Sequence, residues 1–251
     1  MIPNLEMQVN RTNAGLYTVA YGRKEAPLDV QEAAFAANNL SMVSPAQLGF
    51  LRAREDTGIF KPYSRTSADV FYDNKNNQVV IVPDGAISRL VGRVGIANLV
   101  EAHRKNKEYV IPEAQRDLVY GMIDEMLSNG TAFTFPHGQT SVATSEFGKN
   151  DLTLRMFSDK NLGFEAQEYG EWLKSQGREV NSFFMDDKSY AQKASYLNRL
   201  RLYGPVDGFG VEGNGNLDYY DGAFGVRFEK TASDMRGELG EPRSPATGVK
   251  K

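Results

Sequence analysis

Residues 196–228 of the chain read YLNRLRLYGPVDGFGVEGNGNLDYYDGAFGVRF, and the composition of this stretch changes at Tyr203. The segment Tyr203–Phe224 contains six glycines and five aromatic residues, and no lysine or arginine lies between Arg201 and Arg227. Tyrosine mixed with glycine, asparagine and aspartate is typical of antibody loops. There tyrosine offers a large contact area at low entropic cost, and the small polar residues adapt their hydrogen bonds. The composition indicates a recognition surface.

A second interpretation of the same stretch stays open. Glycine and asparagine let a chain turn tightly between strands, so these residues also fit a pair of glycine-rich turns whose tyrosines pack onto a sheet. If the stretch is instead exposed, its four acidic residues, Asp207, Glu212, Asp218 and Asp221, give it a formal charge of −4. That charge favours a basic or polar protein partner.

Two motifs in the stretch suggest cofactors. Gly208, Gly210 and Gly213 match the spacing of a dinucleotide-binding fingerprint, but such a site needs a helix N-terminus after the glycines to hold the pyrophosphate. The following residues, Asn214–Asp218, are a poor helix start and include further turn formers. The oxygen-bearing side chains of Asn214, Asn216, Asp218 and Asp221 suit calcium, although their spacing is not that of a known calcium loop. Calcium remains a minor alternative, and we expect no cofactor and no metal.

The chain offers little for catalysis. It has no cysteine, which excludes disulfides, thiolate catalysis and sulfur-ligated metal centres. It has two histidines, and His137 lies at the boundary between an expected strand and a turn. A hydrolase that uses His137 with a carboxylate such as Glu146 is the enzyme alternative. We expect a binding protein and no enzyme.

Charge and hydropathy exclude two further classes of partner. The net charge is −3, so the chain lacks the basic footprint of a nucleic-acid-binding protein. No apolar run approaches the roughly 18 residues that a membrane helix needs, and Met1–Glu6 lacks the pattern of a signal peptide. The sequence predicts no membrane insertion, and it leaves a cytoplasmic or virion-associated location open.

Helical and strand patterns alternate without a regular strand–helix–strand rhythm, which predicts an α+β fold. Strands are expected at Leu16–Tyr21, Val70–Tyr72, Gln78–Val82, Phe133–Phe135, Leu152–Phe157, Val180–Met185, Tyr196–Tyr203 and Phe224–Glu229. Helices are expected at Asp29–Ala37, Pro45–Glu55, Ala86–Arg104, Pro112–Leu127 and Phe164–Gln176. Residues 231–251 carry no periodic pattern and are expected to be disordered.

Tyr196-Leu197-Asn198-Arg199-Leu200, the polar-aromatic stretch after it and the closing Gly222–Phe228 resemble the variable region of diversity-generating retroelement variable proteins. The resemblance implies a C-type-lectin-type fold, in which a scaffold strand leads into a hypervariable patch and a Gly-Ala-x-Gly-Val-Arg-like strand closes it. Phe224 stands at the intervening position x. The family replaces adenines in Asn-type codons, which cannot yield Lys, Glu, Gln, Met or Trp. From Leu197 to Phe228 only Glu212 belongs to that set, so the resemblance implies that Glu212 is a fixed scaffold residue.

The front of the chain is similar to the same fold. The strand at Leu16–Tyr21, the helix at Asp29–Ala37 and the link Leu40–Ser44 into a second helix resemble its opening. The resemblance implies one domain over residues 1–230 with a mixed, mostly antiparallel sheet, a large insertion at about 58–177 and a variable region at about 197–228. The lectin disulfides and the Glu-Pro-Asn calcium motif are absent, which argues against calcium-dependent sugar binding. The related formylglycine-generating enzymes use cysteines, which this chain lacks.

These observations predict a ligand-display protein whose ligand is a protein. Aromatic side chains would anchor the ligand, as they do in interface hot spots. The other alternative is a structural or assembly protein that buries this face in a permanent subunit contact, and the oligomeric state stays open. The residues expected to contact the ligand are Tyr203, Pro205, Val206, Asp207, Phe209, Asn214, Asn216, Asp218, Tyr219, Tyr220, Asp221 and Phe224.

Overall fold

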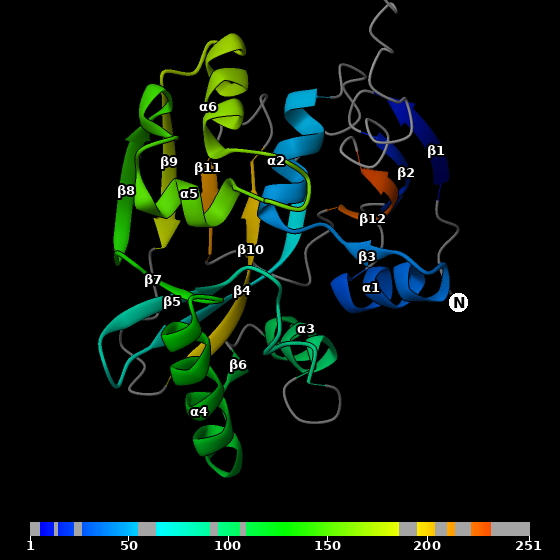
Figure 1. Ribbon diagram of the computed structural model, residues 1–251. Coiled ribbons are helices and arrows are strands. Elements are labelled where there is room, and N and C mark those ends of the chain that lie inside the picture. The colour runs from blue at the N-terminus through cyan, green and yellow to red at the C-terminus, as the bar shows by residue number, and fades with distance from the viewer. Residues whose placement is uncertain are drawn as a thin grey trace, which may run out of the picture.

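One mixed β-sheet joins the described strands of the protein (Figure 1). The computed structural model describes residues 6–12, 15–22, 27–54, 64–90, 95–105, 109–185, 195–203, 210–213 and 222–231. From one edge to the other, the main path of the sheet is β1 (Glu6–Thr12), β2 (Gly15–Gly22), β12 (Ala223–Thr231), β4 (Ser64–Asp73), β10 (Tyr196–Leu202), β11 (Gly210–Glu212), β9 (Val180–Met185) and β8 (Gly138–Ala143). Among the described strands, the pairs β12–β4 and β11–β9 are parallel and the others are antiparallel. The predicted α+β class and the mostly antiparallel sheet are therefore confirmed.

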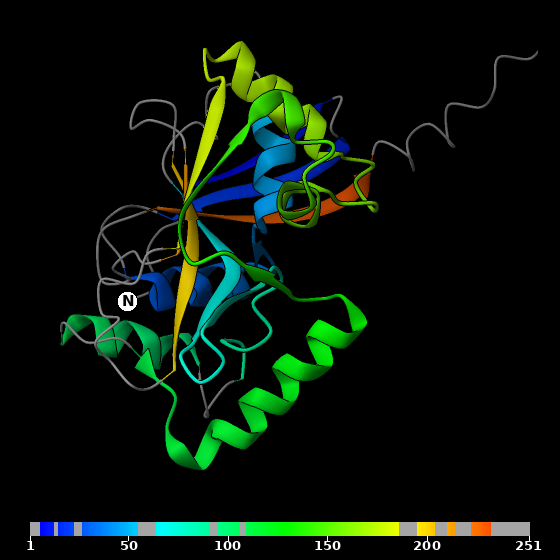
Figure 2. The same ribbon diagram turned by 90° about the vertical axis from the view of Figure 1, so that its left-hand side faces the viewer.

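Shorter strands and seven helical segments complete the described part of the chain. β3 (Ser41–Met42) pairs with β12, β6 (Tyr109–Val110) pairs with β10, and β5 (Gln78–Val82) lies between β4 and β7 (Phe133–Phe135). The helices are α1 (Leu28–Ala37), α2 (Pro45–Arg54), α3 (Ile96–Arg104), α4 (Glu113–Asn129), α5 (Asp151–Phe157) and α6 (Ala166–Ser175), with a 3₁₀ turn, η1, at Thr144–Glu146. Figure 2 shows β10 running between the group of α2, α5 and α6 and the opposite end, where α3 and α4 lie.

Apolar side chains on the two faces of the sheet form two cores. On β4, Val70 and Tyr72 belong to the core that α2, α5 and α6 cover, whereas Phe71 between them belongs to the core shared with α1, α3 and α4. β5 alternates in the same way, because successive side chains of a strand point to opposite faces. Both faces of these strands are thus buried, which explains the continuous apolar run Val79–Val82 on β5.

Three of the elements predicted from sequence are wrong in type or extent. The strand predicted at Val70–Tyr72 is the end of a longer strand, β4, that begins at Ser64. Leu152–Phe157 is not a strand but part of α5, because the side chain of Asn150 caps a helix there by accepting hydrogen bonds from the backbone N–H groups of Leu152 and Thr153 at 3.0 and 3.3 Å. The helix predicted at Ala86–Arg104 begins only at Ile96, after a turn that follows Gly85, whose φ is +65°. Four strands, β1, β3, β6 and β8, and the short β11 were not predicted.

The segment interpreted as an insertion supplies part of the central sheet. β4 lies within residues 58–177, and it pairs with β10, β5 and β12. The limits of that insertion and of the single domain remain predictions. Of residues 231–251, predicted to be disordered, Thr231 is instead the last residue of β12, and residues 232–251 lie outside the described residues. Within the part of the chain that the structure describes, no helix is long and apolar enough to cross a membrane.

Candidate ligand-binding surface

Four adjacent strands, β12, β4, β10 and β11, meet where the two segments predicted to bind a ligand leave the sheet. Arg201 on β10 stands opposite Glu212 on β11 and, on the other side, opposite Arg65 on β4, which in turn faces Ala223 on β12. The first segment, 204–209, connects β10 to β11, and the second, 214–221, connects β11 to β12. Both segments therefore begin and end on one small region of the sheet.

Backbone hydrogen bonds close the base of the first segment. The N–H of Tyr203 donates to the carbonyl of Gly210 at 2.9 Å. The carbonyl of Tyr203 accepts a hydrogen bond from Nη1 of Arg52 at 3.1 Å, and the same nitrogen lies 3.1 Å from the hydroxyl of Tyr169. Arg52 is 2% exposed, so α2 holds the end of β10 through a buried guanidinium.

Glu212 fixes the side chains at this base. Its Oε2 accepts a hydrogen bond from Nε of Arg201 at 2.6 Å, forms an ion pair with Nη2 of Arg201, and accepts a further hydrogen bond from the hydroxyl of Tyr203. The side chains of Arg201 and Glu212 are each 14% exposed. Glu212 is thus a structural residue of the sheet, which agrees with its expected place in a fixed scaffold.

The second segment is held at both ends. Before it, the N–H of Gly213 donates to the carbonyl of Phe184 at 3.0 Å. After it, the carbonyl of Gly222 accepts a hydrogen bond from the N–H of Arg65 at 3.2 Å, and the N–H of Ala223 donates to Oε1 of Gln31 at 3.0 Å. Gln31 is fully buried on α1, so this helix fixes the start of β12.

The structure describes two of the residues expected to contact a ligand. Tyr203 is half-buried, and its ring lies edge-on to Phe184 with the centroids 6.5 Å apart. Phe224 is 1% exposed, and its ring centroid lies 4.7 Å from that of Tyr21. The expectation that Phe224 lies on the exposed face is wrong, because on β12 its side chain points into the core beneath α2, α5 and α6.

The other ten candidate residues lie outside the described residues, in 204–209 and 214–221. They are Pro205, Val206, Asp207, Phe209, Asn214, Asn216, Asp218, Tyr219, Tyr220 and Asp221. Their participation in binding stays a prediction.

The residues of the enzyme alternative lie outside this surface, His137 between β7 and β8 and Glu146 in η1. His137 follows β7, with its ring centroid 6.5 Å from that of Tyr72. Glu146 forms an ion pair with Lys149 at 3.7 Å, and its side chain is 53% exposed. Within the described part of the chain, no group of three histidine, aspartate or glutamate residues is placed to hold a metal ion.

Two residues that fix this site were not predicted. Arg52 and Gln31 are polar positions of α2 and α1, and in the sequence they resemble any solvent-facing helical residue. Their role depends on contacts with Tyr203 and Ala223, which are more than 150 residues away in the chain. A local pattern carries no signal of such a contact.

No protein-family model and no curated protein sequence matches the chain. Its structure is similar to a solved structure from work on "Accommodation of massive sequence variation in Nanoarchaeota by the C-type lectin fold". The two chains are 14% identical at a TM-score of 0.53, and the match covers 88% of this chain and all of the other. This likeness establishes the fold. The protein has a C-type lectin fold, as the resemblance of its first and last segments implied.

Proposed function

We propose that the protein is a ligand-binding display protein, diversified by a retroelement, whose variable residues lie in segments 204–209 and 214–221. One observation carries the proposal: both segments are joined to adjacent strand ends through backbone atoms and scaffold side chains. Backbone hydrogen bonds do not depend on which side chains the segments carry. The sequence between the anchors can therefore vary without loss of the bonds that position it.

The likeness in fold supports the same proposal. The similar solved structure concerns a C-type lectin fold that accommodates massive sequence variation in Nanoarchaeota. In this chain, the one residue of the variable region that adenine replacement cannot produce is Glu212, and Glu212 is bound to Arg201 and Tyr203 in the sheet.

The proposed ligand is a basic or polar protein. Because Glu212 is paired with Arg201, the charge of the surface comes from Asp207, Asp218 and Asp221, and neither segment contains a lysine or arginine. Complementary charge of this kind steers association and suppresses wrong partners. Tyr219 and Tyr220 would supply the anchoring contacts.

The gene itself offers the first test. The DNA around the gene should contain a near-copy of the codons for residues 197–228, differing at adenines and lying beside a reverse transcriptase gene. A complete flanking sequence without such a copy would contradict diversification by a retroelement. It would leave the question of binding to the protein experiment.

Binding is tested with a ligand selected against the intact chain from a displayed peptide library. The double variant Tyr219→Ala/Tyr220→Ala should lose affinity by about 2 kcal/mol or more, because aromatic anchors dominate such interfaces. Its thermal unfolding should match that of the parent. Leu118→Ala, which truncates an exposed side chain on α4, is the control and should bind as the parent does. If the double variant unfolds, the two rings belong to the core and the proposed surface is wrong.

A further inference from the structure

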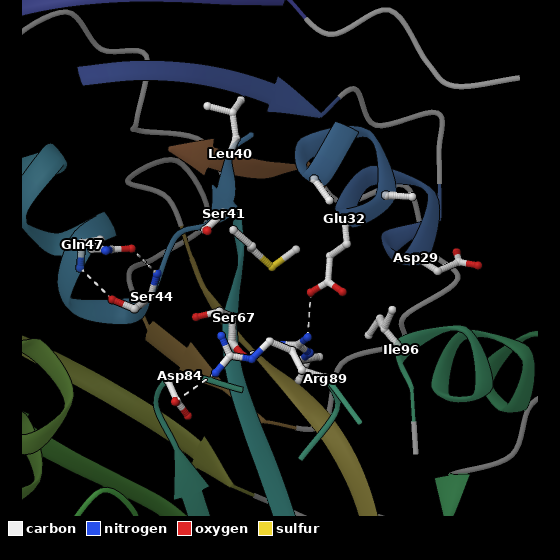
Figure 3. A pocket seen from close by; sticks show the side chains of 14 residues that line it. Asp29, Glu32, Leu40, Ser41, Ser44, Gln47, Ser67, Asp84, Arg89 and Ile96 are labelled. Carbon is white, nitrogen blue, oxygen red and sulfur yellow. Dashed lines mark hydrogen bonds and ion pairs between the residues drawn. The ribbon is translucent and has the colours of Figure 1, made fainter. Parts of the chain in front are cut away.

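Two features of the molecule lie outside the proposed binding surface. One is a pocket of about 530 Å³ between α1, β3 and the start of α3 (Figure 3). Its Glu32 is paired with Arg199 at 2.7 Å and its Asp84 with Arg89 at 3.0 Å, so these charges are already satisfied within the protein. The other feature is the outer edge of β8, which offers backbone groups to a partner.

The strand β8 ends the main path of the sheet. It pairs with β9 from Gly138 to Ala143, and among the described strands nothing pairs with its other side. Figure 1 shows β8 at the border of the molecule, with no labelled element on its outer side. The edge of a sheet presents unpaired N–H and C=O groups, which can bond to another extended chain.

The pairing with β9 shows which backbone groups of β8 point outward. Opposite residues of an antiparallel pair alternate between those that exchange hydrogen bonds and those that do not. Just after β8, the N–H of Thr144 donates to the carbonyl of Glu179 at 2.9 Å, which fixes the alternation. The hydroxyl oxygens of Ser141 and Ser182 lie 3.2 Å apart, as expected of the closer pairs that exchange no backbone bonds. The residues whose N–H and C=O groups point outward are therefore Gln139, Ser141 and Ala143.

This edge lacks the features that protect other edge strands. Natural edges are protected by charged side chains, proline, bulges or short length. The opposite edge of the sheet, β1, carries Glu6 and Arg11. β8 has six residues, Gly-Gln-Thr-Ser-Val-Ala, with no charge and no proline, and its register with β9 runs without a bulge. The edge is therefore open to pairing.

The sequence of β8 fits a second copy of itself. In an antiparallel pair with a two-fold axis at Ser141, outward residues meet outward residues, so Ser141 faces its own copy and Gln139 faces Ala143. These three side chains are exposed, and no like charges meet. On the other face Thr140 would lie opposite Val142, a pair of β-branched residues that suits neighbouring strands.

We propose that two copies of the chain associate through β8, so that one sheet continues across both molecules. The outward N–H and C=O groups of each β8 would bond to those of the other, and the same groups are satisfied on both chains at once. Segments 204–209 and 214–221 leave the sheet from other strands. This inference therefore does not depend on the proposed function.

The experiment is sedimentation equilibrium of the full chain over roughly 1 to 500 μM, because a contact of one strand pair is at the small end of protein interfaces. The mass should rise with concentration from 27.9 kDa toward twice that value. Ser141→Lys and Ser141→Glu each place like charges opposite one another at the axis. Each should raise the dissociation constant of the dimer by about fivefold or more.

A mixture of these two variants is the sharper measurement. Ser141→Lys and Ser141→Glu in equal amounts should associate again, because opposite charges then meet across the axis. Ser182→Lys makes the same chemical change one strand further in, on β9, and should dimerise as the parent does. Circular dichroism establishes that each variant is folded.

Three results would overturn the proposal. The first is a parent that stays monomeric over the whole range. The second is a dimer that both Ser141 variants leave unchanged, since the contact would then lie on another face. The third is a mixture of the two variants that associates no better than either variant alone. Tyr219→Ala/Tyr220→Ala should dimerise as the parent does, and loss of its dimer would place the contact on the variable segments instead.

Discussion

Gly225 lies where the ring of Phe35 crosses β12, and the place that a Cβ atom would take is already occupied by that ring. Gly222 is in the same position with respect to Tyr21. In both cases an aromatic ring lies directly against the backbone of β12. The glycines of the closing sequence Gly222–Phe228 are therefore packing requirements of the scaffold.

Gly225→Ala should lower the free energy of unfolding by about 1–3 kcal/mol, because the added methyl group overpacks the contact with Phe35. Urea unfolding measures the loss. Gly121→Ala is the matched control: it lies on the exposed side of α4, where a Cβ meets no atom within 4 Å. It should gain about 1 kcal/mol from helix propensity. Equal effects at the two sites would show that the Phe35 contact is not tight.

Asp69 links stability to pH. Burial raises its pKa from the ordinary value of 3.8, so between 3.8 and the raised value the folded chain holds a proton there that the unfolded chain has released. Stability contributed by this group is therefore lost as pH rises through that interval. The free energy of unfolding of the parent relative to Asp69→Asn should fall over the same interval. A difference that stays constant or grows with pH would contradict this assignment. Carbon NMR of the Asp69 carboxyl group gives the pKa directly.

The role of a single residue of the site was predictable only where its neighbours along the sequence determine that role. Glu212 stood out because it is the one residue of its region that the expected diversification cannot make, and the structure pairs it with Arg201. Phe224 was misplaced, because a strand buries alternate side chains and the pattern alone does not say which face is covered. Arg52 and Gln31 gave no signal, since their partners are distant in the chain.

At the scale of elements, the starts of α2 and α5 followed their capping chemistry. Ser44 and Pro45 predicted the start of α2, and there the Ser44 hydroxyl accepts from the N–H of Gln47 at 3.1 Å while Oε1 of Gln47 accepts from the N–H of Ser44 at 3.0 Å. Asn150 caps α5 as an acceptor alone, and the alternating sequence Leu152–Phe157 also fits a strand. For a segment this short, the cap is a better guide than the alternation.

Ser44→Ala should destabilise the protein by about 1 kcal/mol, because it leaves the N–H of Gln47 without its acceptor at the end of a mostly buried helix. Thermal unfolding followed by circular dichroism measures it. Ser128→Ala, at an exposed position near the end of α4, should change stability by less than about 0.5 kcal/mol. Comparable losses from both variants would argue against a specific capping role.

The Glu212 side chain adds to the backbone pairing between β10 and β11. Glu212→Ala should cost about 1.5–3 kcal/mol, since it removes the shared acceptor of Arg201 and Tyr203 from a largely buried place. Tyr203→Phe removes one of those hydrogen bonds and should cost less. Glu146→Ala breaks an ion pair whose two side chains are more than half exposed, and it should have little effect. Denaturant unfolding of the three variants gives the order, and a different order would weaken the scaffold role of Glu212.

Across the whole molecule, β4 and β5 contribute side chains to both cores. Neither core can come apart without exposing strands of the other. We expect one cooperative unfolding transition. The fluorescence of Trp172, the only tryptophan, reports on α6, and it should change together with the far-ultraviolet circular dichroism. Two separate transitions would show that the half with α3 and α4 unfolds independently.

Local sequence patterns did not predict the order of the strands in the sheet. The sequence predicted β9, β10 and β12 separately, but the parallel pairing of β11 with β9 and the place of β4 between β10 and β12 are contacts between distant segments. The resemblance to a known fold indicated the class of architecture. The pairing of β4 with its neighbours was not expected, because β4 lies in the segment interpreted as an insertion outside the fold.

The closed bases of segments 204–209 and 214–221 also have a consequence for protein engineering. A chain without cysteines keeps its structure in a reducing expression host, where disulfide-dependent antibody fragments fail. Since the entropy of closing a loop grows slowly with length, doubling either segment would cost only about 0.6 kcal/mol. Randomised sequences grafted between Tyr203 and Gly210 and between Gly213 and Gly222 would turn this protein into a compact scaffold for selected binding reagents.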